Sequence, residues 1–489
     1  MESKKNKQSS ISSALIWKFL ERFGVQGTQF VLQIVLARIL DPEHYGVLSM
    51  MIIFTTLANV FIQRGFNTAL IQNKDVTEED YSSVFWVTMV IAAGLYGVLF
   101  FAAPWIAKFY EMPDLVQPFR VLCLVLFPGA LNSIQIAKIS RNLQFKKIFF
   151  SNVAAILVAG VTGVVLAYLG AGLWALVAQN LLNVFVACIV MWLTVKFRPR
   201  LVCNFARIKV LFAYGWKLLV SGLIDTLYQD LRSLVIGKKY DSGTLGYYNR
   251  GKQFPQFIIN AINTTVQSVM LPAFSKNQSE KEKVKGMMRN SIILSSYIIF
   301  PMMAGLAGVA EPLVKILLTE KWLPCVPYMQ IYCFTFAFYP VHSCNLQAIN
   351  AMGRSDIFLK LEIIKKAMGV TALTIAVFCF NSPIAIAMTG IITGIISCFI
   401  NAGPNRKLVN YFYREQIADI LPSMLASIVM LAGVLALGRL QFNEWIIISL
   451  QVVAGVAIYL GISWLLKLPP FMLFMETVKK IMPKKKRNS

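Results

Sequence analysis

Long runs of apolar residues alternate with short polar segments along the whole chain. Each run is close to the roughly 20 residues that a helix needs to cross a lipid bilayer. The pattern predicts fourteen membrane-spanning helices, over residues 14–37, 46–70, 84–107, 115–137, 149–169, 173–195, 211–237, 254–274, 291–310, 325–349, 367–382, 384–402, 417–438 and 444–466. Little of the chain is left for a soluble domain, so the sequence predicts an all-α, polytopic membrane protein.

The composition agrees with this prediction, because 57% of the residues are apolar and only 14% are charged. The net charge of +24 could indicate nucleic-acid binding, so the positions of the basic residues have to decide. If the amino terminus is cytoplasmic, 32 of the 47 Lys and Arg residues fall on the cytoplasmic side and nine on the other. This asymmetry follows the positive-inside rule. It predicts a multi-pass protein with both termini in the cytoplasm and no nucleic-acid partner.

Other common site chemistries are absent from the sequence. The eight cysteines are dispersed, and the two histidines, His44 and His342, are far apart in the chain. No metal site, disulfide framework or cofactor is therefore predicted. The chain also has no Walker-type phosphate loop, so ATP use by this chain is not predicted.

The chain repeats itself at an offset near 200 residues. Trp17-Lys18 recurs as Trp216-Lys217, and ARILDPEHYG recurs as GKKYDSGTLG. With a larger offset, Phe127-Pro128 recurs as Tyr339-Pro340, in each case with a glutamine seven residues after the proline. Six predicted spans separate the two starting points, so both copies enter the membrane from the same side.

The repeat predicts two parallel bundles of six helices followed by a two-helix hairpin. The predicted division is an N-lobe at 1–200, a C-lobe at 201–410, accessory spans at 411–466 and a basic cytoplasmic tail at 467–489. The accessory spans carry few polar residues, so we expect them to face lipid. The tail is typical of a flank that lies beside anionic lipid, and a specific protein partner is the alternative. The loop from Lys196 to Lys209 is expected to be a flexible tether between the lobes.

Polar residues form matching stripes in the first and seventh spans. Their spacing of 0, 4, 8, 11 and 15 residues places each stripe within an arc of about 80° on a helix. The second and eighth spans add amides at related positions, and Arg64 adds a cation. The stripes and amides are Lys18, Arg22, Gln26, Gln29 and Gln33; Lys217, Ser221, Asp225, Tyr228 and Arg232; Gln63 and Asn67; and Asn263 and Gln267.

These stripes predict a shared cavity that favours an anionic cargo. Charges inside a membrane are costly and usually face protein or water. Within the predicted spans of the two lobes, six basic residues oppose three acidic ones. Arg and Lys suit phosphate oxygens, whereas amides and aromatic rings suit sugars. The alternative is that Glu21, Asp225 and the neighbouring cations pair with one another and only hold the lobes together.

At these residues the chain resembles the polysaccharide-type flippases of the multidrug/oligosaccharidyl-lipid/polysaccharide exporter superfamily. The nearest branch is that of the Wzx-type lipopolysaccharide, colanic-acid and teichuronic-acid exporters. The segments that carry the resemblance are WKFLERFGVQ, LARILDPEHYG, RGFNTALIQ, GYYNRGKQ, AEPLVKILLTEKW and NAMGRSDIFLKLEIIKK.

The resemblance implies a V-shaped transporter in the bacterial cytoplasmic membrane that moves an undecaprenyl-pyrophosphate-linked oligosaccharide to the outer leaflet by alternating access. Lipid-linked oligosaccharide, membrane lipid and glycan polymerases are the partners it implies. The cations expected to steer or bind pyrophosphate are Lys18, Arg22, Arg64, Lys217, Arg232, Arg250 and Lys252. Arg250 and Lys252 are expected in an outer loop after the seventh span.

Three other functions remain open at this point. A drug exporter of the same superfamily would need an acidic cavity for cationic drugs, whereas these stripes are basic. A polyprenyl-sugar enzyme would need a large outer domain with catalytic carboxylates, and the outer connections are short. A channel or scaffold does not account for duplicated charged stripes. For a transporter, Glu21 and Asp225 are the carboxylates best placed to couple transport to a proton or a cation.

Overall fold

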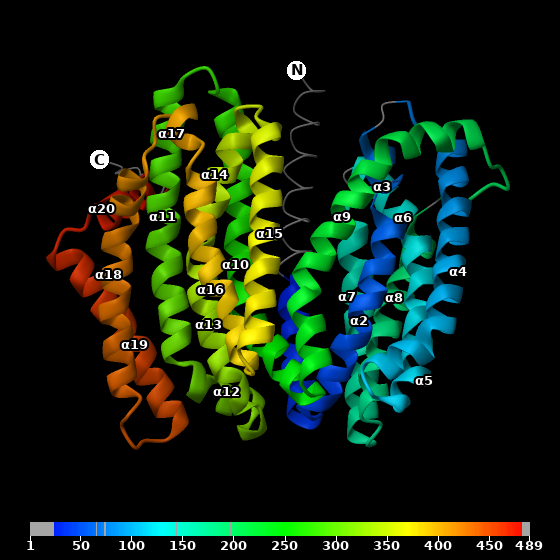
Figure 1. The fold of residues 1–489 in the computed structure, drawn as a ribbon, viewed down its shortest axis with the longest axis horizontal. Helices are drawn as coiled ribbons and strands as arrows, with labels where there is room; N and C mark the ends of the chain where they lie inside the picture. Colours follow the sequence, from blue (N-terminus) through cyan, green and yellow to red (C-terminus); the bar gives the residue numbers. More distant parts are fainter. Residues whose placement is uncertain (1–23, 65, 73–74, 143, 196, 482–489) are drawn as a thin grey trace, which may run out of the picture. The chain divides into compact units, whose positions relative to one another are not determined.

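The computed structural model describes residues 24–64, 66–72, 75–142, 144–195 and 197–481, and it contains helices and no strands in these ranges (Figure 1). The first helical segment covers residues 24–39. The remaining α-helices are α2 (Pro42–Gln63), α3 (Phe66–Gln72), α4 (Glu78–Phe109), α5 (Val116–Leu122), α6 (Leu126–Arg141), α7 (Phe145–Tyr168), α8 (Leu173–Thr194), α9 (Phe205–Lys239), α10 (Ser242–Lys276), α11 (Lys281–Gly308), α12 (Ala310–Leu318), α13 (Val326–Ala337), α14 (Tyr339–Ala351), α15 (Ser355–Cys379), α16 (Pro383–Ala402), α17 (Asn405–Leu408), α18 (Tyr413–Leu437), α19 (Glu444–Leu465) and α20 (Pro469–Ile481). Three 3₁₀ turns join them: η1 (Pro113–Leu115), η2 (Cys123–Val125) and η3 (Glu320–Cys325).

Nine helical stretches within the described residues are long and apolar enough to cross a membrane. A tenth is reached if α9 counts as one span despite a 52° bend between Ala213 and Gly215. The chain is therefore a multi-pass, all-α membrane protein, as the apolar runs predict.

The chain divides into two compact units, Met1–Gly246 and Tyr247–Ser489. In the first unit, α2, α3 and α4 pack against α6 and α9 around a core that includes Phe66, Phe85 and Ile134. In the second unit, α11 packs against α13, α14 and α18. α9 lies with the first unit because its amino-terminal part packs on α3 and α4. The predicted lobe boundary at 200/201 rests on the sequence repeat, and it stays a prediction.

The predicted fourth and tenth spans are both interrupted. The fourth consists of η1, α5, η2 and α6, and the tenth of η3, α13 and α14. The repeated aromatic-proline pairs lie in the first turn after each interruption, at Phe127-Pro128 in α6 and Tyr339-Pro340 in α14. Proline is tolerated there because the first turn of a helix has no backbone acceptor for its missing N–H.

The amino-terminal ends of α2 and α10 cross at two glycines whose numbers differ by 200. A Cβ atom on Gly46 would lie 1.7 Å from the carbonyl oxygen of Ser242, and one on Gly246 would lie 2.2 Å from the carbonyl oxygen of Pro42. Both contacts fall within the first unit. The two residues that they meet, Pro42 and Ser242, also differ by 200 in number, so the two contacts are reciprocal. Only glycine permits so close an approach of two backbones.

The carboxyl-terminal helices are joined to the second unit more extensively than the sequence predicts. One face of α18 and α19 exposes apolar residues such as Leu425, Val429 and Val453, as expected of helices that face lipid. The other face is polar at several points: Asp419 forms a bidentate ion pair with Arg289 of α11 and accepts a hydrogen bond from the Tyr411 hydroxyl at 2.8 Å. The sequence does not reveal these partners, because Arg289 lies 130 residues before Asp419 in the chain.

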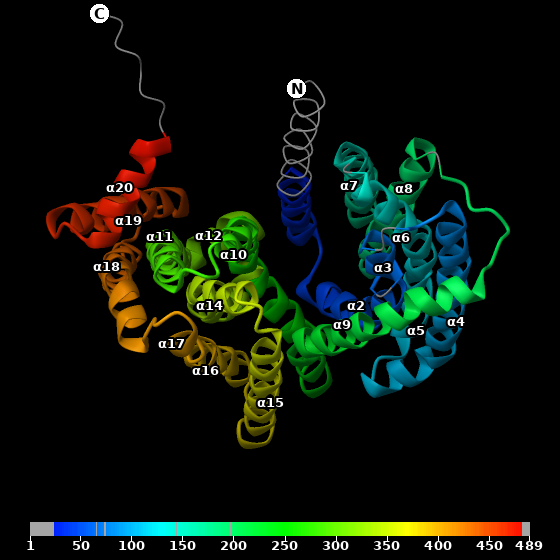
Figure 2. The same cartoon turned by 90° about the horizontal axis from the view of Figure 1, so that it is seen from above.

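Two further ties hold this region together. Lys285 of α11 pairs with Glu415 of α18 at 2.8 Å, and Lys315 of α12 pairs with Glu444 of α19 at 3.1 Å. The first part of the predicted tail is the amphipathic helix α20, which packs Phe474 against Tyr297 of α11. Figure 2 shows α18, α19 and α20 beside α11. Residues 469–481 are thus an ordered part of the second unit and not only a basic flank.

Candidate functional site

The polar stripe of the first span is described only in part. Lys18, Glu21 and Arg22 lie outside the described residues. Of the remaining amides in this helix, Gln29 is exposed and Gln33 is half-buried.

The stripe of the seventh span lies on α9, in the part of the helix that follows the bend. Lys217 and Ser221 are exposed, whereas Asp225, Tyr228 and Arg232 are half-buried. Asp225 and Arg232 both interact with other groups of the protein. At a rise of 1.5 Å per residue, Lys217 and Arg232 are about 22 Å apart along the helix. The stripe therefore presents cations near both ends and a carboxylate between them.

Arg64 is brought directly against α9. It follows the last residue of α2, where the backbone turns to an extended conformation and the Arg64 N–H bonds to the carbonyl of Val60. Its side chain crosses the bare backbone of Gly222, because a Cβ on Gly222 would lie 2.5 Å from Arg64 Cδ and 3.3 Å from Nε. On a helix, Gly222 is about 60° from Asp225. Two predicted site residues from different spans, Arg64 and Asp225, therefore belong to one region of the first unit.

The amides of the second and third helices continue this region. Gln63, the last residue of α2, is exposed, and Asn67 is half-buried in α3. The Oδ1 atom of Asn67 is buried and has no hydrogen-bond partner among the described residues. Their predicted counterparts lie in α10 of the second unit, where Gln267 is half-buried and the side chain of Asn263 is outside the described part of the structure.

The positions of Arg250 and Lys252 differ from the prediction. Both lie inside α10 and not in a loop, because the helix begins at Ser242, about three turns earlier than the apolar run. Arg250 is only 5% exposed, donates a hydrogen bond to Gln253 at 2.8 Å and stacks over the Trp322 ring at 5.0 Å. Lys252 is half-buried, with its ammonium 5.8 Å from the centroid of the Tyr332 ring. Arg250 is thus packed into the second unit.

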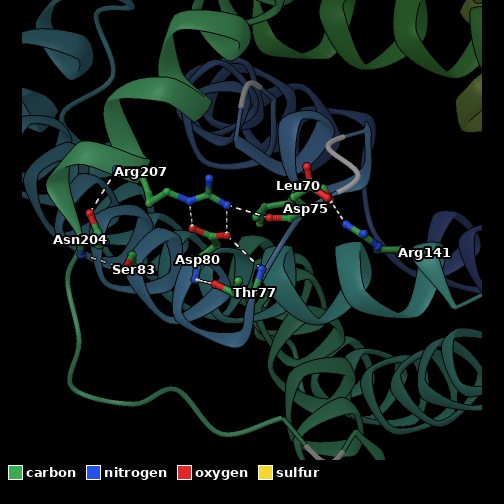
Figure 3. Close-up of polar contacts among 8 residues, drawn as sticks. All are labelled: Leu70, Asp75, Thr77, Asp80, Ser83, Arg141, Asn204 and Arg207. Atoms are coloured by element: carbon green, nitrogen blue, oxygen red, sulfur yellow. Dashed lines mark hydrogen bonds and ion pairs between the residues drawn. The ribbon is translucent and has the colours of Figure 1, made fainter.

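Hydrogen bonds attach the segment before α9 to the start of α4, so it is not the free loop that the sequence suggests; Figure 3 shows the attachment of Asn204 to Ser83. The backbone N–H groups of Arg200 and Asn204 donate to the hydroxyls of Ser82 and Ser83. The guanidinium of Arg207 donates to both oxygens of Asp80, which is 2% exposed, at 2.9 and 2.7 Å. These bonds fix the amino-terminal end of α9 to the first unit.

The local sequence explains why Asp80 is available to Arg207. Thr77 and Asp80 form a capping box at the start of α4, with each side chain bonded to the backbone N–H of the other. The T-x-x-D spacing was a readable signal of this cap. Its pairing with Arg207, 127 residues later, could not be read from the sequence.

The other end of α9 is tied to the turn after α4. Lys238 donates a hydrogen bond to Glu111 at 2.8 Å and stacks over the Phe109 ring. The Lys238 ammonium lowers the pKa of the Glu111 carboxyl, because it stabilises the charged form. Glu111 is largely exposed, so this pair is weak. α9 is nevertheless attached to α4 near both of its ends.

A family model described as "Polysaccharide biosynthesis protein" matches residues 35–327. The chain is 24% identical over 450 residues to the lipopolysaccharide biosynthesis protein WzxC of Escherichia coli, and the alignment covers 89% of each chain. It is 26% identical over 309 residues to the teichuronic acid biosynthesis protein TuaB of Bacillus subtilis, covering 62% of this chain and 63% of TuaB.

Among solved structures, the chain is similar to the lipid II flippase MurJ in an inward closed conformation. The TM-score is 0.75 at 16% identity, and the match covers 93% of this chain and 98% of that structure. At this identity the likeness establishes the fold, and function has to be argued from the site and the family.

Proposed function

Because the chain belongs to the family of polysaccharide biosynthesis proteins, we propose that it is a flippase for an undecaprenyl-pyrophosphate-linked oligosaccharide. It moves this lipid from the inner to the outer leaflet of the bacterial cytoplasmic membrane, for the export of a polysaccharide. The observation that carries the proposal is the family match, together with a similarity to WzxC that extends over 89% of both chains. The resemblance read from the sequence is confirmed by these comparisons.

The charged region of the first unit supports an anionic head group as the cargo. Arg64 directly follows α2, and Lys217 and Arg232 lie on α9, which packs against α2. Guanidinium and ammonium groups bind the oxygens of a pyrophosphate, while Gln29, Gln33, Gln63 and Asn67 offer donors and acceptors for sugar hydroxyls. We propose the same roles for Lys18, Arg22, Asn263, Gln267 and Lys252. Arg250 is the least suited of these cations to bind the head group, because its guanidinium stacks on Trp322 inside the protein.

The architecture we propose is fourteen spans, arranged as two parallel six-helix repeats and a carboxyl-terminal hairpin. Two features favour the repeat: the interruptions at Phe127-Pro128 and Tyr339-Pro340, and the reciprocal glycine contacts between α2 and α10. Repeats of this kind suit alternating access, in which one bundle rocks against the other. Because hydrogen bonds attach the segment before α9 to α4, we propose that the motion occurs within or after α9.

Transport of cationic drugs is the alternative within the same superfamily. It is disfavoured by the cationic side chains of the stripes, which would repel such a cargo. A polyprenyl-sugar enzyme is disfavoured by relatives that are named for polysaccharide biosynthesis and transport, such as the succinoglycan biosynthesis transport protein ExoT. We therefore treat the protein as a transporter.

The function is tested by reconstituting the purified chain in liposomes with a fluorescent undecaprenyl-pyrophosphate-linked disaccharide. We expect the protein to accelerate movement of the disaccharide between leaflets, measured as loss of the fluorescence of the inner-leaflet pool to an impermeant quencher added outside. Liposomes without protein give the background rate. A background rate in the presence of the protein, together with export of a cationic dye, would favour the drug-exporter alternative.

Energy coupling can be measured in the same liposomes. We propose Asp225 and Glu21 as coupling groups, because they are the best-placed carboxylates within the predicted seventh and first spans. A proton or a sodium gradient, imposed separately, identifies the coupled ion by its effect on the rate.

We also propose that both termini are cytoplasmic, and two natural cysteines test this orientation. Only Cys203 and Cys379 are exposed among the cysteines of the described residues. Cys203 precedes α9 on the predicted cytoplasmic side, and Cys379 ends α15 on the predicted outer side. An impermeant maleimide should label Cys379 in sealed spheroplasts and Cys203 only after permeabilisation, with Cys203→Ser and Cys379→Ser assigning the signals. Labelling of Cys203 in sealed spheroplasts would reverse the orientation.

A further inference from the structure

Gly222 occupies an unusual position on α9. It is buried, although Ser221 beside it is exposed and Asp225 one turn later is half-buried. Its nearest neighbours outside its own helix are Val60 of α2 and Arg64, which directly follows α2. A Cβ on Gly222 would lie 2.5 Å from Arg64 Cδ, 3.3 Å from Arg64 Nε and 3.3 Å from a methyl group of Val60. The space that a side chain would fill is taken by Arg64.

Glycine is costly in the middle of a helix, by roughly 0.5–1 kcal/mol relative to alanine. A glycine at such a place needs a local reason. At Gly46 two backbones are in contact, whereas at Gly222 the helix backbone contacts the aliphatic part of the Arg64 side chain. The absent side chain of Gly222 therefore makes a slot that holds Arg64 against α9.

We propose that Gly222 is a positioning residue for head-group recognition: it fixes the guanidinium of Arg64 beside the polar stripe of α9, so that Arg64 meets an anionic phosphate group together with that stripe. The inference rests on the proposed function and adds a residue that composition and charge do not reveal. An alanine at position 222 would force Arg64 into another rotamer, because no Cβ fits 2.5 Å from Cδ. The charge of the site would be unchanged, and only its geometry would be lost.

The test is a double-mutant cycle on the purified, full-length protein, with inorganic pyrophosphate as the probe and its apparent Kd as the readout. Removing a charge-assisted contact costs about 10- to 100-fold in affinity, and this is expected for Arg64→Ala. Gly222→Ala should weaken binding by about 5-fold or more. In the Arg64→Ala background, Gly222→Ala should have no further effect. A packing role alone does not predict this dependence on Arg64.

The matched control is Gly27→Ala, because a Cβ at Gly27, in the helical segment 24–39, meets nothing within 4 Å. It should bind pyrophosphate like the unmodified protein. Equal losses from Gly222→Ala with and without Arg64 would overturn the inference, and so would unchanged affinity in Gly222→Ala or the absence of pyrophosphate binding by the unmodified protein.

Thermal unfolding keeps the test valid if Gly222→Ala folds poorly. Because Arg64 occupies the slot, removal of its side chain should restore the unfolding midpoint of Gly222→Ala to that of Arg64→Ala. A double variant that remains as unstable as Gly222→Ala would show that the glycine serves helix packing only. The liposome assay tests the proposed function by measuring transport. The pyrophosphate titration tests this inference by measuring binding and its dependence on Gly222, so the two failures can be told apart.

Discussion

Arg232→Ala is expected to abolish export of the lipid-linked glycan while leaving the amount of protein in the membrane near normal. Arg232 lies half-buried near the end of the α9 stripe, in the same helix as Lys217 and Asp225. A guanidinium in such a place can bind two phosphate oxygens at once, and partial burial strengthens the contact. Its loss should reduce the rate in liposomes by at least about 10-fold. Arg22→Ala, in the corresponding stripe of the first span, should behave in the same way.

Conservative variants separate recognition from structural pairing. Arg232→Lys keeps the charge but not the two-pronged geometry, so it should rescue export poorly if phosphate is the partner. If Arg232 serves only to neutralise an acidic neighbour, Lys should restore most of the activity. Full activity of both Ala variants would mean that the cationic stripes hold the protein together and do not bind the cargo.

The sequence predicts the helices well because lipid imposes a strong rule: apolar runs of sufficient length become helices. The predicted spans within the described residues overlap helices, although the fourth and tenth are each divided, and nine or ten helical stretches there are long and apolar enough to cross a membrane. Helix ends are predicted less well. The apolar run of the eighth span starts near residue 254, but α10 starts at Ser242, so Arg250 was expected in a loop and is in fact packed inside a helix.

Contacts between distant residues explain the other differences. Charge spacing within one helix identifies a stripe, but it does not reveal that Arg207 binds Asp80 or that Arg289 binds Asp419. Both pairs join elements separated by more than a hundred residues. The attachment of the segment before α9 was not expected for the same reason: a polar segment with several basic residues is typical of a loop without partners, and its hydrogen-bond partners on α4 are visible only in three dimensions.

The second large effect is expected at the crossing of α2 and α10, where Gly46→Ala and Gly246→Ala should each destabilise the protein. The added methyl groups would lie 1.7 and 2.2 Å from backbone oxygens, which cannot rotate away as a side chain can. The helices must therefore separate, at a cost of about 1–3 kcal/mol or more for overpacking. The measurement is the midpoint of thermal unfolding in detergent, together with glycan export in cells.

Gly94→Ala and Gly97→Ala provide the control, because a methyl group at either position of α4 meets nothing within 4 Å. These variants should keep full stability or gain up to about 1 kcal/mol, since alanine favours a helix more than glycine does.

The combination of Gly46→Ala and Gly246→Ala is the sharper test. The two contacts are adjacent, with the Cβ position of Gly246 only 3.4 Å from the Gly46 nitrogen, so a separation that accommodates one methyl group also makes room for the other. The double variant should therefore lose less stability than the sum of the single losses. Strict additivity would show that the two glycines act at independent contacts, and that the crossing is not one reciprocal interface.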